Sequence, residues 1–203
     1  MDRVKIKQVD NNYDKYLSIK DINERFNKAY KYKFYYECLW LNYALIEDRT
    51  KALFYHIGFL NKNRDGVHSN PKIKGTIRKL LKFDKEQNRY NFDKLFYKID
   101  YINKLIDWVK SDEVVNDEYE KELKKVLKKY MNNEEFINTI NYLNTEWRNI
   151  RNELAHGLCN KKIEAVSIEL KELVENGYNS FKIISKAING IKRNNIRKKF
   201  KIQ

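Results

Sequence analysis

The chain has 203 residues, of which 42 are Lys or Arg and 28 are Asp or Glu, so its formal net charge is +14. This length is typical of one domain, and 42 % apolar residues supply a sizeable core, which excludes disorder throughout. No run of about 18 apolar residues occurs, and the N-terminus lacks the apolar stretch of a signal peptide, so we expect a cytoplasmic protein that does not enter a membrane. Two cysteines without a CxxC pattern exclude a disulfide framework and a zinc ribbon.

One Pro and six Gly leave too little turn chemistry for an all-β fold. The periodicity of the apolar residues instead predicts an all-α fold, a bundle of about five to seven helices. We expect residues 1–20 to form an N-terminal arm or short irregular segment, 21–192 the helical domain, and 193–203 a basic, solvated tail.

The predicted elements follow in chain order. Residues 22–60 contain no Pro or Gly before Gly58 and predict one long helix, or two in line; residues 61–71 then form the clearest loop, with Asp-Gly and the single Pro. Asn91 and Asn133 are suited to cap the helices that follow them, and Gly157 to end one. The further helices are expected at about 72–88, 92–109, 115–131, 133–157 and 161–192.

The helix predicted for 133–157 has a regular apolar pattern. Its apolar residues are separated by steps of 4, 3, 4, 3 and 4, which is the two-position seam of a coiled coil. These residues are Phe136, Ile140, Leu143, Trp147, Ile150 and Leu154.

The end of this helix carries the one group of residues that is suited to catalysis, in the string RNELAHG. If the helix ends at Gly157, His156 lies in the cap turn and can approach Arg151, so that both meet one phosphate. Arg supplies a permanent charge for developing negative charge, His a proton that exchanges near neutral pH, and Asn152 an amide that orients them. On spacing alone, a histidine that caps its helix is the favoured alternative.

A second pair, Arg49 and His56, has a similar spacing. We expect this pair to lie in the middle of a helix, where the two residues pack or are exposed at the surface and take no part in catalysis.

The string R-N-x-x-x-H at the end of a long amphipathic helix resembles the signature of the HEPN superfamily, which includes metal-independent ribonucleases of toxin–antitoxin, abortive-infection and CRISPR-associated systems. The signature is Arg, then four to six residues and His, with a polar residue directly after the Arg; Arg151, Asn152 and His156 match it position by position. The resemblance covers the motif helix closely and the bundle, about 25–190, loosely.

The resemblance implies a homodimer in which two motifs face one cleft, with Trp147, Ile150 and Leu154 available for the contact. An ordinary core position within one chain is an equally good assignment for most of these three residues. The resemblance also implies an antitoxin or regulatory partner. In some members an acidic residue on an earlier helix lies near the site, and Glu47 or Asp48 is the candidate for that supporting role, with a surface carboxylate as the alternative.

We therefore expect an endoribonuclease without metal or cofactor, in phage defence or a toxin–antitoxin system, that cleaves single-stranded RNA or tRNA by attack of the 2′-OH. Its catalytic residues would be Arg151, Asn152 and His156. The alternative is a non-catalytic HEPN-like helical module that binds RNA or a protein partner. The charge of +14 fits an RNA partner, or it reflects a Lys-rich composition.

The string YKYKFYY, 30–36, could stack bases, although an amphipathic helix that buries its aromatic residues is the better prediction.

Overall fold

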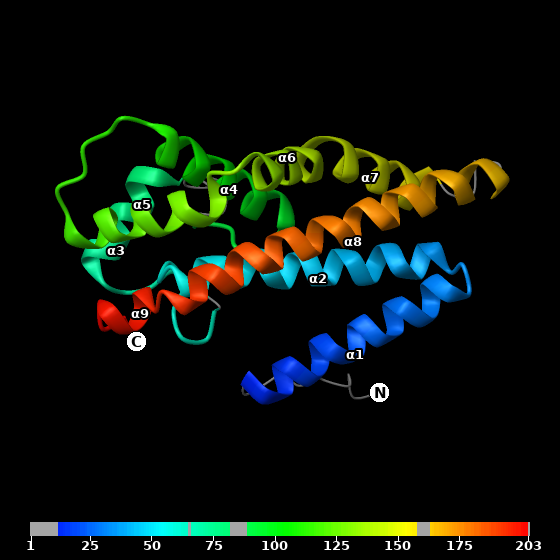
Figure 1. The fold of residues 1–203 in the computed structure, drawn as a ribbon, viewed down its shortest axis with the longest axis horizontal. Helices are drawn as coiled ribbons and strands as arrows, with labels where there is room; N and C mark the ends of the chain where they lie inside the picture. The colour runs from blue at the N-terminus through cyan, green and yellow to red at the C-terminus, as the bar shows by residue number, and fades with distance from the viewer. Residues whose placement is uncertain (1–11, 65, 82–88, 158–162, 203) are drawn as a thin grey trace.

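The computed structural model describes residues 12–64, 66–81, 89–157 and 163–202 (Figure 1). In these ranges the regular structure is helical and contains no strand, and Leu60 and Val67 form an isolated antiparallel bridge. The predicted all-α class is therefore confirmed. None of the described helices is both long enough and apolar enough to cross a bilayer.

The described part of the chain contains α-helices and, between α6 and α7, the π-helical segment η1. Their bounds are α1 Asn12–Lys31, α2 Tyr35–His56, α3 Pro71–Leu80, α4 Leu95–Lys110, α5 Glu118–Met131, α6 Glu134–Tyr142, η1 Leu143–Trp147, α7 Arg148–Gly157, α8 Ile163–Arg193 and α9 Ile196–Lys199.

The first two helices form an antiparallel pair, which corrects the prediction of one helix or two in line (Figure 1). The chain reverses at residues 32–34, where Lys33 takes the left-handed conformation with φ of 61°. Residues 32–34 contain neither Gly nor Pro, so residue types do not predict this turn. Residues 12–20 form the first half of α1, which corrects the predicted N-terminal arm over 1–20 for this part of the chain.

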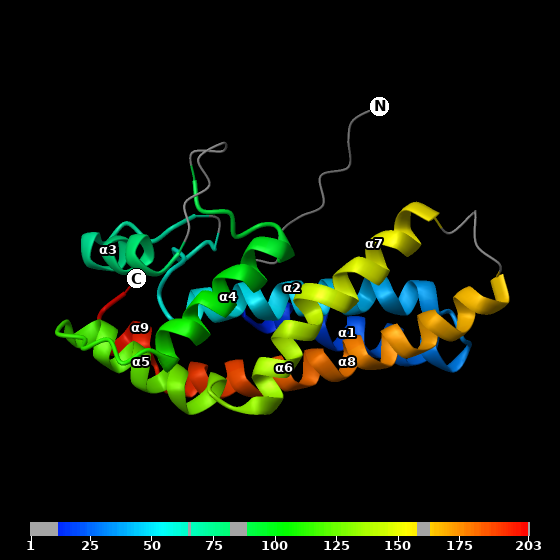
Figure 2. The ribbon, with the colours of Figure 1, turned by 90° about the horizontal axis from the view of Figure 1, so that it is seen from above.

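Helices α2 and α8 pack along each other and form the scaffold for the rest (Figures 1 and 2). Leu45, Ile46 and Ile184 are almost fully buried in the core, and each such side chain contributes about 1.5–3 kcal/mol through the apolar area it removes from water. The Asn42 amide donates a hydrogen bond to the Val174 carbonyl at 2.8 Å. This bond connects α2 directly to α8.

The predicted helix 133–157 is present as α6, η1 and α7. The Asn133 side chain accepts a hydrogen bond from the Phe136 amide at 2.9 Å, which confirms the predicted cap. The π-helical segment adds a local distortion that is frequent near functional sites. Its Trp147 fits against α8 because Gly177 has no side chain: a Cβ there would lie 2.7 Å from the indole nitrogen.

Helix α7 diverges from α2 and α8 toward its C-terminal end, as the view from above shows (Figure 2). Burial along the seam decreases toward this helix. Phe136, Ile140, Leu143 and Trp147 of the seam are buried in the core, whereas Ile150 is only partly buried.

Two further boundaries differ from the sequence prediction. Helix α3 ends at Leu80, and residues 82–88 of the helix predicted for 72–88 lie outside the described part. Helix α4 begins at Leu95 because the Asn91 side chain accepts hydrogen bonds from the amides of Asp93 and Lys94 and stabilises a turn before the helix.

The segment expected as a solvated tail is packed against the bundle. Ile196 and Ile202 are buried, and the Arg197 guanidinium donates hydrogen bonds to the carbonyls of Tyr55 at 3.1 Å and Leu60 at 2.8 Å. The expectation of a solvated tail is therefore wrong. The charge of the segment conceals its few apolar residues in the sequence, and Ile202 lies against Gly58, which follows α2.

Candidate functional site

The predicted catalytic residues lie on α7, the helix that diverges from the bundle. The backbone is α-helical through Gly157, so His156 belongs to the last turn of the helix and not to a cap turn as we had expected. Positions five residues apart on a regular helix are separated by about 140° around its axis. The side chains of Arg151 and His156 lie outside the described part of the chain. Asn152 is described and exposed.

Asn152 lines a pocket of about 430 Å³, which we call the aromatic pocket. Its walls come from α2, the start of α4, η1 and α7, and its lining includes the rings of Tyr43, Phe96 and Trp147. The Arg148 guanidinium lies over the Phe96 ring, 4.8 Å from its centroid. Cations, aromatic faces and an amide of the predicted motif thus meet at one concave surface.

Three polar side chains on the α7 side of this pocket share one helical face. Asn144, Arg148 and Asn152 follow each other at intervals of four residues, and all three line the pocket. Lys94 lines the opposite side. Among the described residues that line the aromatic pocket there is no carboxylate, so its charged groups are cationic.

The two candidate supporting carboxylates are both held in ion pairs. Glu47 accepts a hydrogen bond from the Lys98 ammonium at 3.1 Å, and this ammonium also donates to the Asp93 carbonyl at 3.2 Å. Lys98 is fully buried, and burial lowers its pKa. Glu47 therefore compensates a buried charge, a structural task that the sequence did not reveal.

Asp48 faces a different environment, with the ammonium of Lys15 and the guanidinium of Arg49. Burial by itself raises the pKa of Asp48, but these two cations outweigh it and hold the pKa below its ordinary value. The carboxylate is thus ionised and paired. Neither Glu47 nor Asp48 is among the residues that line the aromatic pocket.

The second Arg/His pair does not lie in the middle of a helix, which corrects our expectation: His56 is the last residue of α2. Arg49 precedes it by seven residues, which is close to two turns, so both lie on one face. Burial is the largest cause that lowers the pKa of His56, and together with the charges of Arg64, Lys192, Arg49 and Lys15 it brings this pKa to about 3.

His56 is therefore neutral at pH 7 and too weak a base to exchange protons there. We call the set formed by His56 and the cations around it the His56 cluster; its cations are Lys15, Arg49, Arg64 and Lys192. This cluster has charge but lacks a group that titrates near neutral pH.

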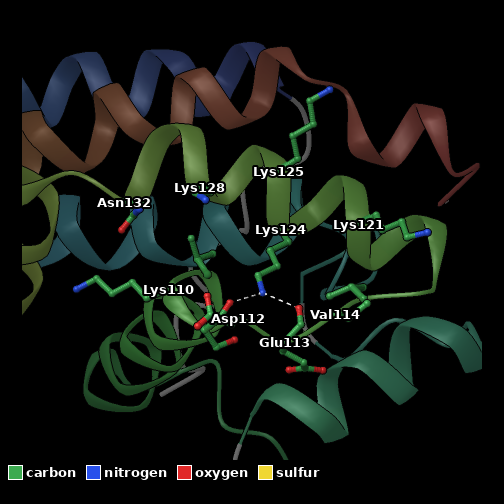
Figure 3. A pocket seen from close by; sticks show the side chains of 12 residues that line it. Lys110, Asp112, Glu113, Val114, Lys121, Lys124, Lys125, Lys128 and Asn132 are labelled. Atoms are coloured by element: carbon green, nitrogen blue, oxygen red, sulfur yellow. Dashed lines mark hydrogen bonds between the residues drawn. The ribbon is translucent and has the colours of Figure 1, made fainter.

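A larger pocket of about 500 Å³ lies between α5 and the loop that follows α4 (Figure 3). We call it the lysine pocket, because Lys110, Lys121, Lys124, Lys125 and Lys128 line it. The Lys124 ammonium donates to the carbonyls of Ser111 at 2.7 Å and Glu113 at 3.0 Å, while Lys121 and Lys125 extend away from it (Figure 3). The pocket therefore offers point charges to an anion, beside the carboxylates of Asp112 and Glu113, and none of its described lining residues supplies an aromatic face.

The aromatic string 30–36 is less buried than predicted. Tyr32 and Phe34, which lie in the turn between α1 and α2, are 57 % and 59 % exposed. Their rings stack with centroids 6.1 Å apart, and Lys31 lies over Tyr32. Burial of all these rings in an amphipathic helix is thus wrong, because the turn removes them from the helix.

Of the residues considered for a dimer contact, Trp147 is 1 % exposed and packs within its own chain, with its ring stacked on Tyr43. Ile150 packs partly against the core, and the side chain of Leu154 lies outside the described part. The alternative of a core position is therefore confirmed for Trp147.

No group of three or more His, Cys, Asp or Glu suited to a metal ion occurs among the described residues. Comparison of the chain with known protein families, curated protein sequences and solved structures finds no match.

Proposed function

We propose that the protein is a metal-independent endoribonuclease of HEPN type that acts on unpaired RNA. The observation that carries the proposal is the position of Asn152. This residue, which directly follows Arg151 in the motif, is exposed and lines a pocket of aromatic rings and cations. RNA is the ligand that uses both kinds of group, because its phosphates attract cations and its unpaired bases stack on rings.

In the proposed reaction a base removes the proton of the 2′-OH, and O2′ attacks the adjacent phosphorus. The P–O5′ bond breaks, and an acid gives a proton to O5′. The products are a 2′,3′-cyclic phosphate and a 5′-OH, with no external oxidant or metal in the balance. His156 takes one of the two proton-transfer roles, Arg151 stabilises the charge on the phosphorane, and Asn152 orients them.

The proposal includes a homodimer, in which a second motif supplies the other proton-transfer group. The support for this element is the resemblance of the motif together with the geometry of α7. Because Arg151 and His156 are separated by about 140° on a regular helix, one α7 by itself is poorly suited to hold both against the same phosphate. Two copies of α7 relieve this difficulty. The resemblance of the motif also leads us to propose an antitoxin or regulatory partner and a role in phage defence.

The test is cleavage of a single-stranded RNA in the presence of EDTA, with the product ends mapped. We expect 2′,3′-cyclic phosphate ends, and no cleavage where the nucleotide before the scissile phosphate is 2′-deoxy. His156→Ala and Arg151→Ala should each reduce the cleavage rate by at least about 100-fold.

His56→Gln is the matched control, because its Arg/His spacing is similar but its surroundings differ, and it should cleave at the rate of the unaltered protein. Unchanged cleavage in both motif variants would refute the assignment. Salt-sensitive RNA binding without any cleavage would instead favour the non-catalytic binding module.

A further inference from the structure

Three aromatic residues form a row on one face of α2 and lead into the aromatic pocket. Tyr36, Trp40 and Tyr43 follow at intervals of four and three residues, with ring centroids 6.2 and 6.3 Å apart. The Tyr43 ring then stacks on Trp147 at 6.4 Å, with an angle of 9° between the planes. We call this series the aromatic row.

The aromatic row changes from exposed to buried along its length. Trp40 is 46 % exposed, whereas Trp147 at the other end is buried. Phe96, on the opposite side of the pocket, is 48 % exposed and carries the Arg148 guanidinium on its face. Large rings seldom remain so exposed in a continuous group without a binding partner.

The charges around the row indicate which partner fits. Lys31 and Lys33 come shortly before Tyr36 in the chain, and Lys94 and Arg148 line the pocket at the inner end of the row. A contact of this pocket with the same pocket of a second copy would place Lys94 and Arg148 against like charges, and no carboxylate among the described lining residues would offset them. A polyanion with flat apolar groups is complementary to both the cations and the rings.

The polar side of the pocket fits the edge of a nucleobase. The amides of Asn144 and Asn152 each contain a donor and an acceptor, the combination that pairs with base edges. The volume of about 430 Å³ lies in the range of sites for small organic groups.

We propose that the aromatic pocket is a subsite for one unpaired nucleobase of the RNA, and that the aromatic row stacks the bases next to it. The proposal rests on the proposed function for the identity of the polyanion as RNA. Because Asn152 belongs to both the motif and the pocket, the base bound there is that of the nucleotide next to the scissile phosphate. A base paired in a duplex cannot enter the pocket, so the subsite selects single-stranded RNA.

The experiment measures binding of the full-length His156→Ala protein to a 12-nucleotide unpaired RNA and to its duplex with the complementary strand, over a series of salt concentrations. Phe96→Ala and Trp40→Ala are added to this background. Each should weaken binding of the single strand by roughly 5- to 100-fold, which is the range for loss of one base–ring stack. Duplex binding should change less than about two-fold, and the salt dependence should stay the same because no cation is removed.

Tyr13→Ala is the matched control, because Tyr13 is an exposed aromatic residue of α1, 68 % exposed, that does not belong to the row. It should bind the single strand as the parent does. A second series places one abasic nucleotide at each position of the RNA. At one position the abasic RNA should bind more weakly, and there Phe96→Ala should have no further effect.

Equal losses for single strand and duplex, or no loss in either variant, would overturn the subsite. So would conversion of a dimer to monomers by Phe96→Ala or Trp40→Ala in sedimentation, because the rings would then form a contact between copies. The design separates the two proposals: binding with these preferences but without cleavage by the unaltered protein refutes the ribonuclease and retains the subsite.

Discussion

The aromatic pocket and the lysine pocket differ in the kind of ligand group that each can hold. The aromatic pocket combines rings, two amides and two cations without a carboxylate among its described lining residues, whereas the lysine pocket combines five lysines with Asp112 and Glu113. A lysine attracts any phosphate, but a ring distinguishes a free base from a paired one. Under the proposed function, the lysine pocket would therefore attract RNA in general, and the aromatic pocket would select RNA that is unpaired.

The largest effect is expected for Trp147, which lines the aromatic pocket. Trp147→Ala removes a buried ring that packs against Tyr43 and α8, so we expect a loss of about 3–5 kcal/mol in unfolding free energy. Trp40→Ala is the control, because its ring is half exposed and its loss should cost less than about 1 kcal/mol. Urea unfolding measures both. Similar losses of unfolding free energy in the two variants would mean that Trp147 contributes no more to the core than the exposed Trp40.

The His56 cluster should make the free energy of unfolding depend on pH. The folded protein holds the pKa of His56 at about 3, below its ordinary value of 6.5, so unfolding takes up a proton between these values. Stability therefore falls as the pH is lowered from about 6.5 toward 3, by at most about 1.4 kcal/mol per pH unit from this residue.

His56→Gln should remove this part of the dependence, and urea unfolding at pH 7, 6 and 5 measures the difference between the two proteins. A constant difference over that range would contradict the low pKa. Binding of RNA phosphates near the cluster would raise the pKa of His56, since an anion offsets the surrounding cations.

The ion pair between Glu47 of α2 and Lys98 of α4 tests whether Glu47 has only a structural role. Glu47→Gln leaves the buried ammonium of Lys98 without its counter-charge, and we expect a loss of about 2 kcal/mol in unfolding free energy. Asp100→Asn, which breaks the partly exposed pair with Lys104, should cost less than about 0.5 kcal/mol. If Glu47→Gln left stability intact but reduced cleavage, the supporting role implied by the family resemblance would be restored.

The smallest effect is expected in the lysine pocket. Lys128→Ala removes one exposed cation and should weaken RNA binding by about two- to three-fold, equally for single strands and duplexes. The slope of log binding constant against log salt should become shallower by up to about 0.7 for the single strand. A preference for either form of RNA would contradict the assignment of this pocket to general attraction.

The sequence predicted the helices well where apolar periodicity was strong and a cap was present. Asn133 and the buried seam from Phe136 to Trp147 were both identified, because a helix face and a side-chain cap are local properties. The turn at Lys33 was missed, since a non-glycine residue in the left-handed region has no sequence signal. The packing of Ile196 and Ile202 was missed because the surrounding charge masks two isolated apolar residues.

The candidate site was predicted in part. The motif on α7 was found from its residue types, and Asn152 is exposed at a pocket. The partners of Glu47 and Asp48, and the rings and cations that surround Asn152, lie many residues away in the chain. No pattern around the motif predicts Phe96 or Tyr43, because they come from two other helices.

The sequence by itself determined an all-α, strongly basic chain and the position of an Arg-Asn-His motif on a late helix, since composition and local periodicity carry this information. Only the tertiary structure decided that α1 and α2 fold back on each other, that His56 is kept neutral, and that the aromatic row of α2 meets the motif helix at one pocket. These features depend on side chains that are distant in sequence and become neighbours when the shared core of α2 and α8 forms.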